Sequence, residues 1–186
     1  MKTIKTRYGV IIETFGQPTE AITAELIEKI YAPININKIK IFDTVATLEG
    51  LLDNIITHYF YGEQTSSNKE HRDKFKGLVL SSDWCTFATK RKLIIHIINE
   101  QSLLKGQEKD DFNNLLRKSM SYRNIFAHGV MSTDGRIIKI KYFEGEQRIV
   151  ELNDDFFTEV ESVLNKCYYL LWEIAINFGS IKIRKE

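Results

Sequence analysis

The chain is poor in the residues that build turn-rich or disulfide-stabilised proteins. Its 186 residues include only two prolines and ten glycines, which argues against a β protein made of many tight turns. The two cysteines, Cys85 and Cys167, both lie in apolar helical patterns, so we expect two buried free thiols. Two cysteines cannot form a zinc site alone, and no nearby histidine pair completes one. The sequence therefore predicts no metal site and no cofactor.

An excess of one charge and long apolar runs are lacking as well. The 26 basic and 25 acidic residues leave a net charge of +1, so any nucleic acid would have to bind at a local patch. The basic segment at residues 1–7 is not followed by an apolar segment, so we expect no signal peptide. No uncharged apolar run approaches the length of a membrane span. We therefore expect a cytoplasmic protein that does not interact with a membrane.

What the sequence does contain is apolar residues at helical spacing in four long segments. Between the third and fourth segments, alternating apolar residues flank Glu144-Gly145-Glu146 and predict a short β-hairpin. The predicted fold class is all-α, an up-and-down bundle of four long helices with this hairpin before the last helix. The predicted helices run from about Asn37 to Tyr61, from a cap at Ser81 or Ser82 to Lys105-Gly106, from Lys109–Asp111 to His128-Gly129, and from Asn153 or Asp154 to Gly179.

Two other regions have weaker patterns. Residues 1–36 form an N-terminal segment of unclear role, before a helical domain at 37–181. Within it, Val10-Ile11-Ile12 suggests a short strand, and a short helix is expected from Pro18 until Pro33 ends it. Residues 63–76 are polar and predict a solvated, mobile loop, whereas Thr133-Asp134-Gly135 predicts a turn before the hairpin.

The run Tyr122–Gly129, at the end of the third predicted helix, is the most informative part of the chain. At about 100° per residue, Arg123 falls within the apolar stripe of this helix. A guanidinium is almost never left unpaired in a core, so we expect a buried acid, a second subunit or an anionic ligand beside it. Glu49, at the edge of the first helix's stripe, is the candidate acid. The stripe consists of Phe112, Leu115, Leu116, Met120, Phe126 and Ala127.

Three polar residues of this run have the chemistry to act on a phosphodiester. Asn124 and His128 are four residues apart and so lie on neighbouring turns, and the long stem of Arg123 can reach toward them. Arg123 can hold the non-bridging oxygens, while His128 can act as general acid or base on the 2′-hydroxyl or the leaving oxygen. Asn124 can orient the imidazole or bind the phosphate, and Gly129 can end the helix in a left-handed conformation. By spacing alone, such a pair is more often a salt bridge and a helix cap.

This stretch resembles the HEPN family. Ribonuclease members of that family carry an arginine, usually followed by a polar residue, and a histidine after four to six intervening positions. Arg123, Asn124 and His128 follow this pattern with four intervening residues. The patterns around Leu48-Glu49 and Leu80-Ser81 resemble the first and second long helices of the family, so the resemblance covers roughly residues 37–178.

The resemblance implies an α-helical bundle that dimerises through two motif helices related by a twofold axis. It further implies metal-independent RNA cleavage at a composite site, in toxin–antitoxin, abortive-infection or anti-phage defence, with a possible cognate antitoxin or defence partner. In the branch whose antitoxin is a nucleotidyltransferase, a tyrosine often lies two residues after the histidine. Val130 occupies that position here, which argues against regulation by modification of such a tyrosine.

Other readings of the sequence remain open. Lys90-Arg91-Lys92 is the densest basic run and is more often a solvated helix face, although Lys90 or Arg91 could guide RNA if this helix borders the dimer cleft. His58 and His96 are expected at the surface. A non-catalytic dimer that binds a nucleotide, RNA or a protein is the alternative to an enzyme, and a purely structural Arg123–Glu49 pair is a third hypothesis.

Overall fold

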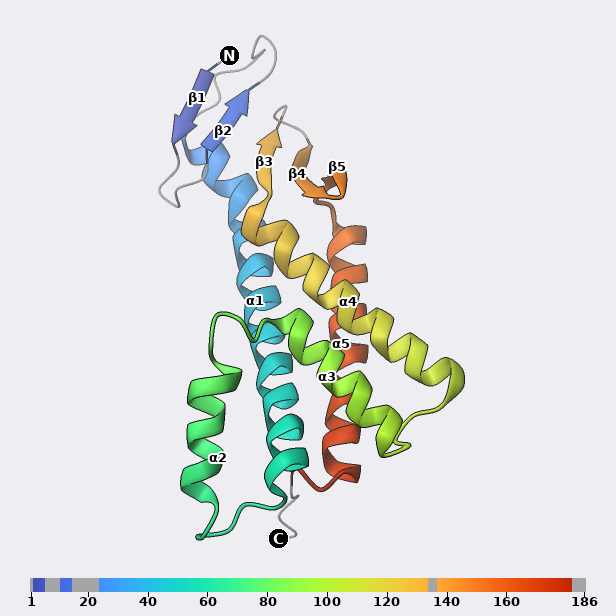
Figure 1. Cartoon of the computed structure of the whole chain (residues 1–186). Coiled ribbons are helices and arrows are strands. Elements are labelled where there is room, and N and C mark those ends of the chain that lie inside the picture. Colours follow the sequence, from blue (N-terminus) through green and yellow to red (C-terminus); the bar gives the residue numbers. More distant parts are fainter. Residues whose placement is uncertain (1, 6–10, 15–23, 134–136, 182–186) are drawn as a thin grey trace, which may run out of the picture. The chain divides into compact units, whose positions relative to one another are not determined.

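The computed structural model describes residues 2–5, 11–14, 24–133 and 137–181 (Figure 1). This part of the chain is mostly helical and carries a small, mainly antiparallel sheet, which confirms the predicted helical class in outline. The chain divides into two compact units. Unit 1 contains the chain up to Asp43 together with Ser121–Ser162, and unit 2 contains Thr44–Met120 together with the chain from Val163 onward. Among the described helices, none combines the length and apolar character needed to span a bilayer.

Three long helices contribute a segment to each unit: α1 (Ala24–Tyr61), α4 (Gly106–His128) and α5 (Asp154–Asn177). Unit 2 also holds α2 (Lys69–Phe75), the π-helical turn η1 (Lys76–Leu80) and α3 (Phe87–Glu100). Its core is formed by aliphatic and aromatic side chains that recur at helical spacing, as the sequence predicted. These buried residues include Val45, Leu48, Leu52, Ile55, Ile56, Ile94, Ile98, Phe112, Leu116, Cys167 and Leu171.

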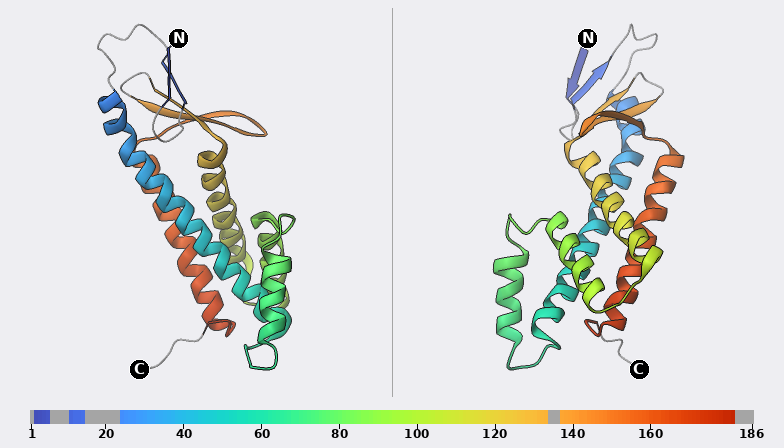
Figure 2. Two further views of the ribbon diagram at one scale, coloured as in Figure 1. Left: turned by 90° about the vertical axis from the view of Figure 1, so that its left-hand side faces the viewer. Right: turned by 45° about the vertical axis from the view of Figure 1, so that its right-hand side comes forward.

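Helix α1 is longer than the sequence predicted. The prediction that Pro33 ends a short helix is wrong, because α1 continues through Pro33 and is uninterrupted in Figure 2. Pro33 is exposed, so the carbonyl that its missing N–H leaves without a helical partner can bind water. Tyr31 and Ile34, on either side of it, are buried, and their packing favours continued helix. The helix is also continuous at residue 36, where an N-terminal segment was expected to end. Residues 18–23 of the expected short helix lie outside the described part.

The connection between α1 and α3 also differs from the prediction. The expected loop at 63–76 contains α2, which is fixed by a hydrogen bond from buried Arg72 to the Gly62 carbonyl oxygen. Helix α3 starts later than expected, since its cap is Thr86 rather than Ser81 or Ser82. The Thr89 amide donates to the Thr86 hydroxyl at 3.3 Å. Trp84, within the range of the predicted helix, precedes α3 and is 65% exposed.

The other helix ends agree better with the sequence. Helix α4 ends at His128 as predicted, although it begins at Gly106 and not near Lys109. The Asn153 side chain accepts a hydrogen bond from the Phe156 amide at 2.9 Å and so caps α5. After the last turn of α5, Gly179 has a φ of +77°, a conformation that favours glycine.

Unit 1 contains the sheet. Strands β3 (Val130–Thr133), β4 (Ile138–Glu144) and β5 (Glu146–Glu151) pair antiparallel in sequence order, and the β4–β5 pair is the predicted hairpin with Gly145 in its turn. Strands β1 (Lys2–Lys5) and β2 (Ile11–Thr14) pair antiparallel and extend the sheet beyond β3, with β2 parallel to β3. The expected strand at 10–12 is therefore confirmed at Ile11 and Ile12. Strand β3 was not predicted, and the rest of the expected turn, residues 134 and 135, lies outside the described part.

Candidate functional site

The last two turns of α4 are fixed within unit 1 by aromatic packing on the start of α5. Tyr122 meets Phe156 edge-on, with ring centroids 6.0 Å apart, and Phe126 stacks on Phe157 at 6.2 Å. The Tyr122 hydroxyl is 3.0 Å from a carboxylate oxygen of Glu159, to which it donates. Burial and this carboxylate both raise the pKa of Tyr122, so it remains a neutral donor across the physiological range. The motif residues thus project from a well-anchored helix end.

Arg123 does not lie in the core. The prediction that it falls in the apolar stripe is wrong, because Arg123 is exposed, as is Ala127. The buried face of the last two turns consists of Tyr122, Ile125 and Phe126. Arg123 lies roughly a quarter turn from the centre of that face, at about 100° per residue. The stripe rotates around α4 because the aromatic residues of α5 define a new buried face in these turns.

The expected acid partner of Arg123 is engaged elsewhere. Glu49 binds Lys90 within unit 2, with Glu49 Oε1 and Lys90 Nζ 2.7 Å apart. Among the described residues, no carboxylate forms an ion pair with Arg123. Its guanidinium instead donates to the Oδ1 atom of the neighbouring Asn124 at 3.4 Å. Glu49, the acid expected beside Arg123, is thus the partner of Lys90.

The exposed side of this helix end forms a small polar surface, which we call the α4 patch: Arg123, Asn124, Ala127 and His128. All four are exposed or half-exposed. Helical spacing places Ala127 one turn after Arg123 and His128 one turn after Asn124, so the four side chains are neighbours. A guanidinium, an amide and an imidazole thus surround a methyl group that leaves room beside them.

Gly129, directly after the patch, has a different role from the predicted one. It does not adopt a left-handed conformation, since its φ is not positive. A Cβ atom at this position would overlap the Ile125 carbonyl oxygen of α4 and would lie 2.6 Å from the Cγ1 atom of buried Ile140 on β4. Glycine is therefore needed because the backbone of α4 and the Ile140 side chain both come close to it here. This contact fixes the chain just beyond His128.

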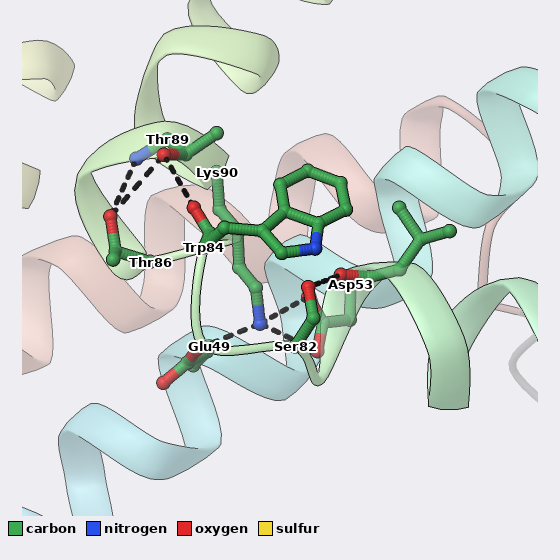
Figure 3. A network of polar contacts seen from close by, with 8 residues as sticks. Glu49, Asp53, Ser82, Trp84, Thr86, Thr89 and Lys90 are labelled. Carbon is green, nitrogen blue, oxygen red and sulfur yellow. Dashed lines mark hydrogen bonds and ion pairs between the residues drawn. The ribbon is translucent and has the colours of Figure 1, made fainter.

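Lys90 is not the solvated cation that the sequence predicted. Figure 3 shows its side chain pointing down from α3 to Glu49 and Asp53 on α1. The Lys90 side chain is 3% exposed, and its Nζ atom lies 2.7 Å from Glu49 and 2.9 Å from Asp53. Burial alone lowers the pKa of Lys90, but the hydrogen bonds and charges of the two acids raise it overall. Lys90 stays charged and joins α1 to α3, so it is not available to RNA.

Arg91, the other predicted RNA-binding residue, keeps part of its side chain at the surface. It is half-buried on α3, and its Nη1 atom donates to Asn113 Oδ1 on α4 at 3.4 Å. The side chains of Lys90 and Arg91, adjacent in sequence, therefore have different environments. The sequence could not separate them, because both lie near the boundary of a helical face.

The remaining candidates for chemistry are structural. Both cysteines are buried and free, as predicted, and burial raises the pKa of Cys167 to about 11. His96 is exposed as expected, whereas His58 is half-buried and meets Phe178 edge-on at 5.2 Å. Burial, and then the charge of Arg72, lower the pKa of His58. Within the described residues, no group of His, Cys, Asp and Glu side chains is arranged to hold a metal ion.

Comparison of the chain with protein-family models found no matching family, and comparisons with curated proteins and with solved structures found no significant similarity. The functional argument therefore depends on the α4 patch itself. The patch residue whose exposure the sequence did not predict is Ala127. Its apolar side chain fits the predicted stripe, but a small residue one turn after an arginine and adjacent to a histidine also fits an exposed site.

Proposed function

We propose that this chain is a metal-independent endoribonuclease of the HEPN type, acting through the α4 patch of a homodimer. The observation that supports the proposal is the exposure of Arg123, Asn124 and His128 on one face of a fixed helix end. Among the described residues, none of the three has a carboxylate partner. An accessible, unneutralised guanidinium beside an imidazole suits a phosphodiester better than it suits a structural salt bridge.

The patch residues have distinct roles in the proposed reaction. The 2′-oxygen of a ribose attacks the adjacent phosphorus, and the bond from phosphorus to the 5′-oxygen breaks, leaving a cyclic phosphate and a 5′-hydroxyl. His128 takes the proton of the 2′-hydroxyl or supplies one to the leaving oxygen. Arg123 binds the non-bridging oxygens, whose negative charge grows in the transition state. Asn124, already hydrogen-bonded to Arg123, holds the guanidinium in position beside the imidazole.

A dimer supplies what one chain lacks. One patch has a single histidine, whereas the reaction uses both a base and an acid. Two α4 helices that meet across a twofold axis would provide two histidines and two arginines, and exposed Ala127 allows the helices to approach closely. In this proposal the described helices form an up-and-down bundle. The protein acts in the cytoplasm in toxin–antitoxin, abortive-infection or anti-phage defence, with a cognate antitoxin or defence partner.

The test is incubation of the purified protein with a mixed RNA pool in excess chelator. We expect cleavage that Arg123→Ala reduces at least a hundredfold, since one transition-state interaction of this kind is typically worth about 10²–10³ in rate. Lys92→Ala, which removes an exposed cation from α3, is the matched control and should cleave normally. RNA that stays intact under all conditions would contradict the enzyme.

The same experiment identifies the alternative function. A non-catalytic HEPN-like dimer would bind a nucleotide, RNA or a partner protein through the α4 patch without turnover. It would show saturable binding that Arg123→Ala abolishes, with the RNA recovered intact. Binding and cleavage are therefore measured on the same samples.

A further inference from the structure

A second group of cationic side chains lies in unit 2, between α3 and α4. Arg91 projects from α3, and its guanidinium donates to Asn113 Oδ1 on α4 at 3.4 Å. Arg117 lies one helical turn after Asn113 and is therefore its neighbour on the surface of α4. Arg91 and Asn113 are half-buried, whereas Arg117 is exposed. Two guanidiniums and an amide thus lie close together within unit 2.

The positive charges of this group are not balanced by acidic side chains within the described residues. Among the described residues, neither Arg91 nor Arg117 forms an ion pair with a carboxylate. The Nε atom of Arg91 is buried without a hydrogen-bond partner. Burial and then the positive charge of Arg117 lower the pKa of Arg91, so the two guanidiniums are close enough to repel each other. A protein rarely leaves a buried donor and a like-charge pair uncompensated unless another group completes the site.

A bound anion would neutralise both guanidiniums, remove their repulsion and accept a hydrogen bond from the Nε atom of Arg91. Guanidinium forks bind phosphate oxygens in a bidentate manner, and a phosphate between two arginines turns their repulsion into attraction. The Asn113 amide can donate its N–H₂ group to the same oxygens while its carbonyl oxygen accepts from Arg91. We propose that Arg91, Asn113 and Arg117 form a phosphate-binding site. The ligand is a phosphate group, either free or in an RNA backbone, and the site does not require that the chain cleave RNA.

Thermal unfolding in phosphate tests the site. Sodium phosphate should raise the unfolding midpoint of the full chain by about 3 °C over sodium chloride at equal ionic strength, since only the folded state binds the anion. Arg117→Gln should lose this rise. Its midpoint in chloride should match or exceed that of the unmodified chain, because the repulsion is gone. Arg91→Gln, the second variant, should also lose the rise. Lys92→Gln, an equal charge change at an exposed neighbouring position, should keep it.

A second arm distinguishes free phosphate from an RNA backbone. If RNA is the source, Arg117→Gln should weaken binding of a single-stranded RNA oligonucleotide about tenfold and lower the salt dependence of that binding, whereas Lys92→Gln should not. If free phosphate is the source, RNA affinity will not change while the phosphate response is lost. An unchanged response to phosphate and to RNA in both arginine variants would overturn the site. RNA cleavage lost in His128→Ala is measured separately, so failure of the site and failure of the proposed ribonuclease remain distinguishable.

Discussion

At the scale of single residues, the two small residues next to His128 are small for different reasons. Ala127 is exposed and leaves room on the α4 patch, whereas at Gly129 the Ile125 carbonyl oxygen and the Ile140 side chain leave no space for a Cβ atom. The sequence identified the motif but not these reasons, because both depend on what lies beside the helix end. The exposure of Arg123 was missed for the same reason, since the aromatic residues of α5 move the buried face of α4.

We predict that Gly129→Ala destabilises the protein by about 1–3 kcal/mol, because the new methyl group would overlap the Ile125 carbonyl oxygen and the Ile140 side chain and the chain would have to shift. The measurement is denaturant unfolding. Gly50→Ala is the matched control, since a Cβ atom at Gly50 in α1 meets nothing within 4 Å. That change should be neutral or stabilising by about 0.5–1 kcal/mol, as expected inside a helix. Equal effects of the two substitutions would refute the close approach.

At the scale of secondary-structure elements, α1 and α3 are joined by the buried Lys90 between Glu49 and Asp53 (Figure 3). We predict that Lys90→Met lowers the free energy of unfolding by about 2–4 kcal/mol, since it leaves two carboxylates close together without their cation. The exposed Lys92→Met should cost less than about 0.5 kcal/mol. Urea titrations of both variants measure the difference, and similar small losses would show that the network does not stabilise the fold.

The same network predicts a dependence on pH. The two acids raise the pKa of Lys90 in the folded state above its ordinary value of 10.5. A group with a raised folded pKa stabilises fully below its unfolded value and loses that contribution as the pH rises through the folded value. The stability gap between the unmodified chain and Lys90→Met should therefore be constant from neutral pH to about pH 10 and shrink above it. A gap that widens at alkaline pH would contradict this assignment.

The apolar pattern of the sequence predicts the long elements better than it predicts their boundaries. The long helices and the β4–β5 hairpin were predictable because their apolar spacing repeats over many residues. Helix α1 passes through Pro33 because packing of Tyr31 and Ile34 outweighs one missing hydrogen bond. The sequence does not predict helix α2, because its seven residues carry almost no apolar pattern and its anchor is the buried Arg72. A buried cation that anchors a helix cannot be recognised from the spacing of apolar residues.

At the scale of the whole molecule, the proposed function requires two chains. We predict that Ala127→Glu reduces dimerisation and RNA cleavage together, because a charged side chain would enter the close helix contact that the proposal places at Ala127. Ala46→Glu, which is the same change at another exposed helical position, should alter neither. Sedimentation velocity and the chelated cleavage assay measure the two effects. A dimer that persists in Ala127→Glu with full cleavage would mean that the α4 patch is not the interface.

The most direct measurement for the whole molecule compares two histidine variants in chelated RNA cleavage. His128→Ala removes the imidazole of the α4 patch, whereas His96→Ala removes an exposed imidazole from α3 that has no proposed role. We predict that His128→Ala cleaves at least a hundredfold more slowly than the unmodified chain, in line with the contribution of one general acid or base. His96→Ala should cleave at the normal rate. Equal cleavage by the two variants would contradict the assignment of His128 and, with it, the proposed ribonuclease site.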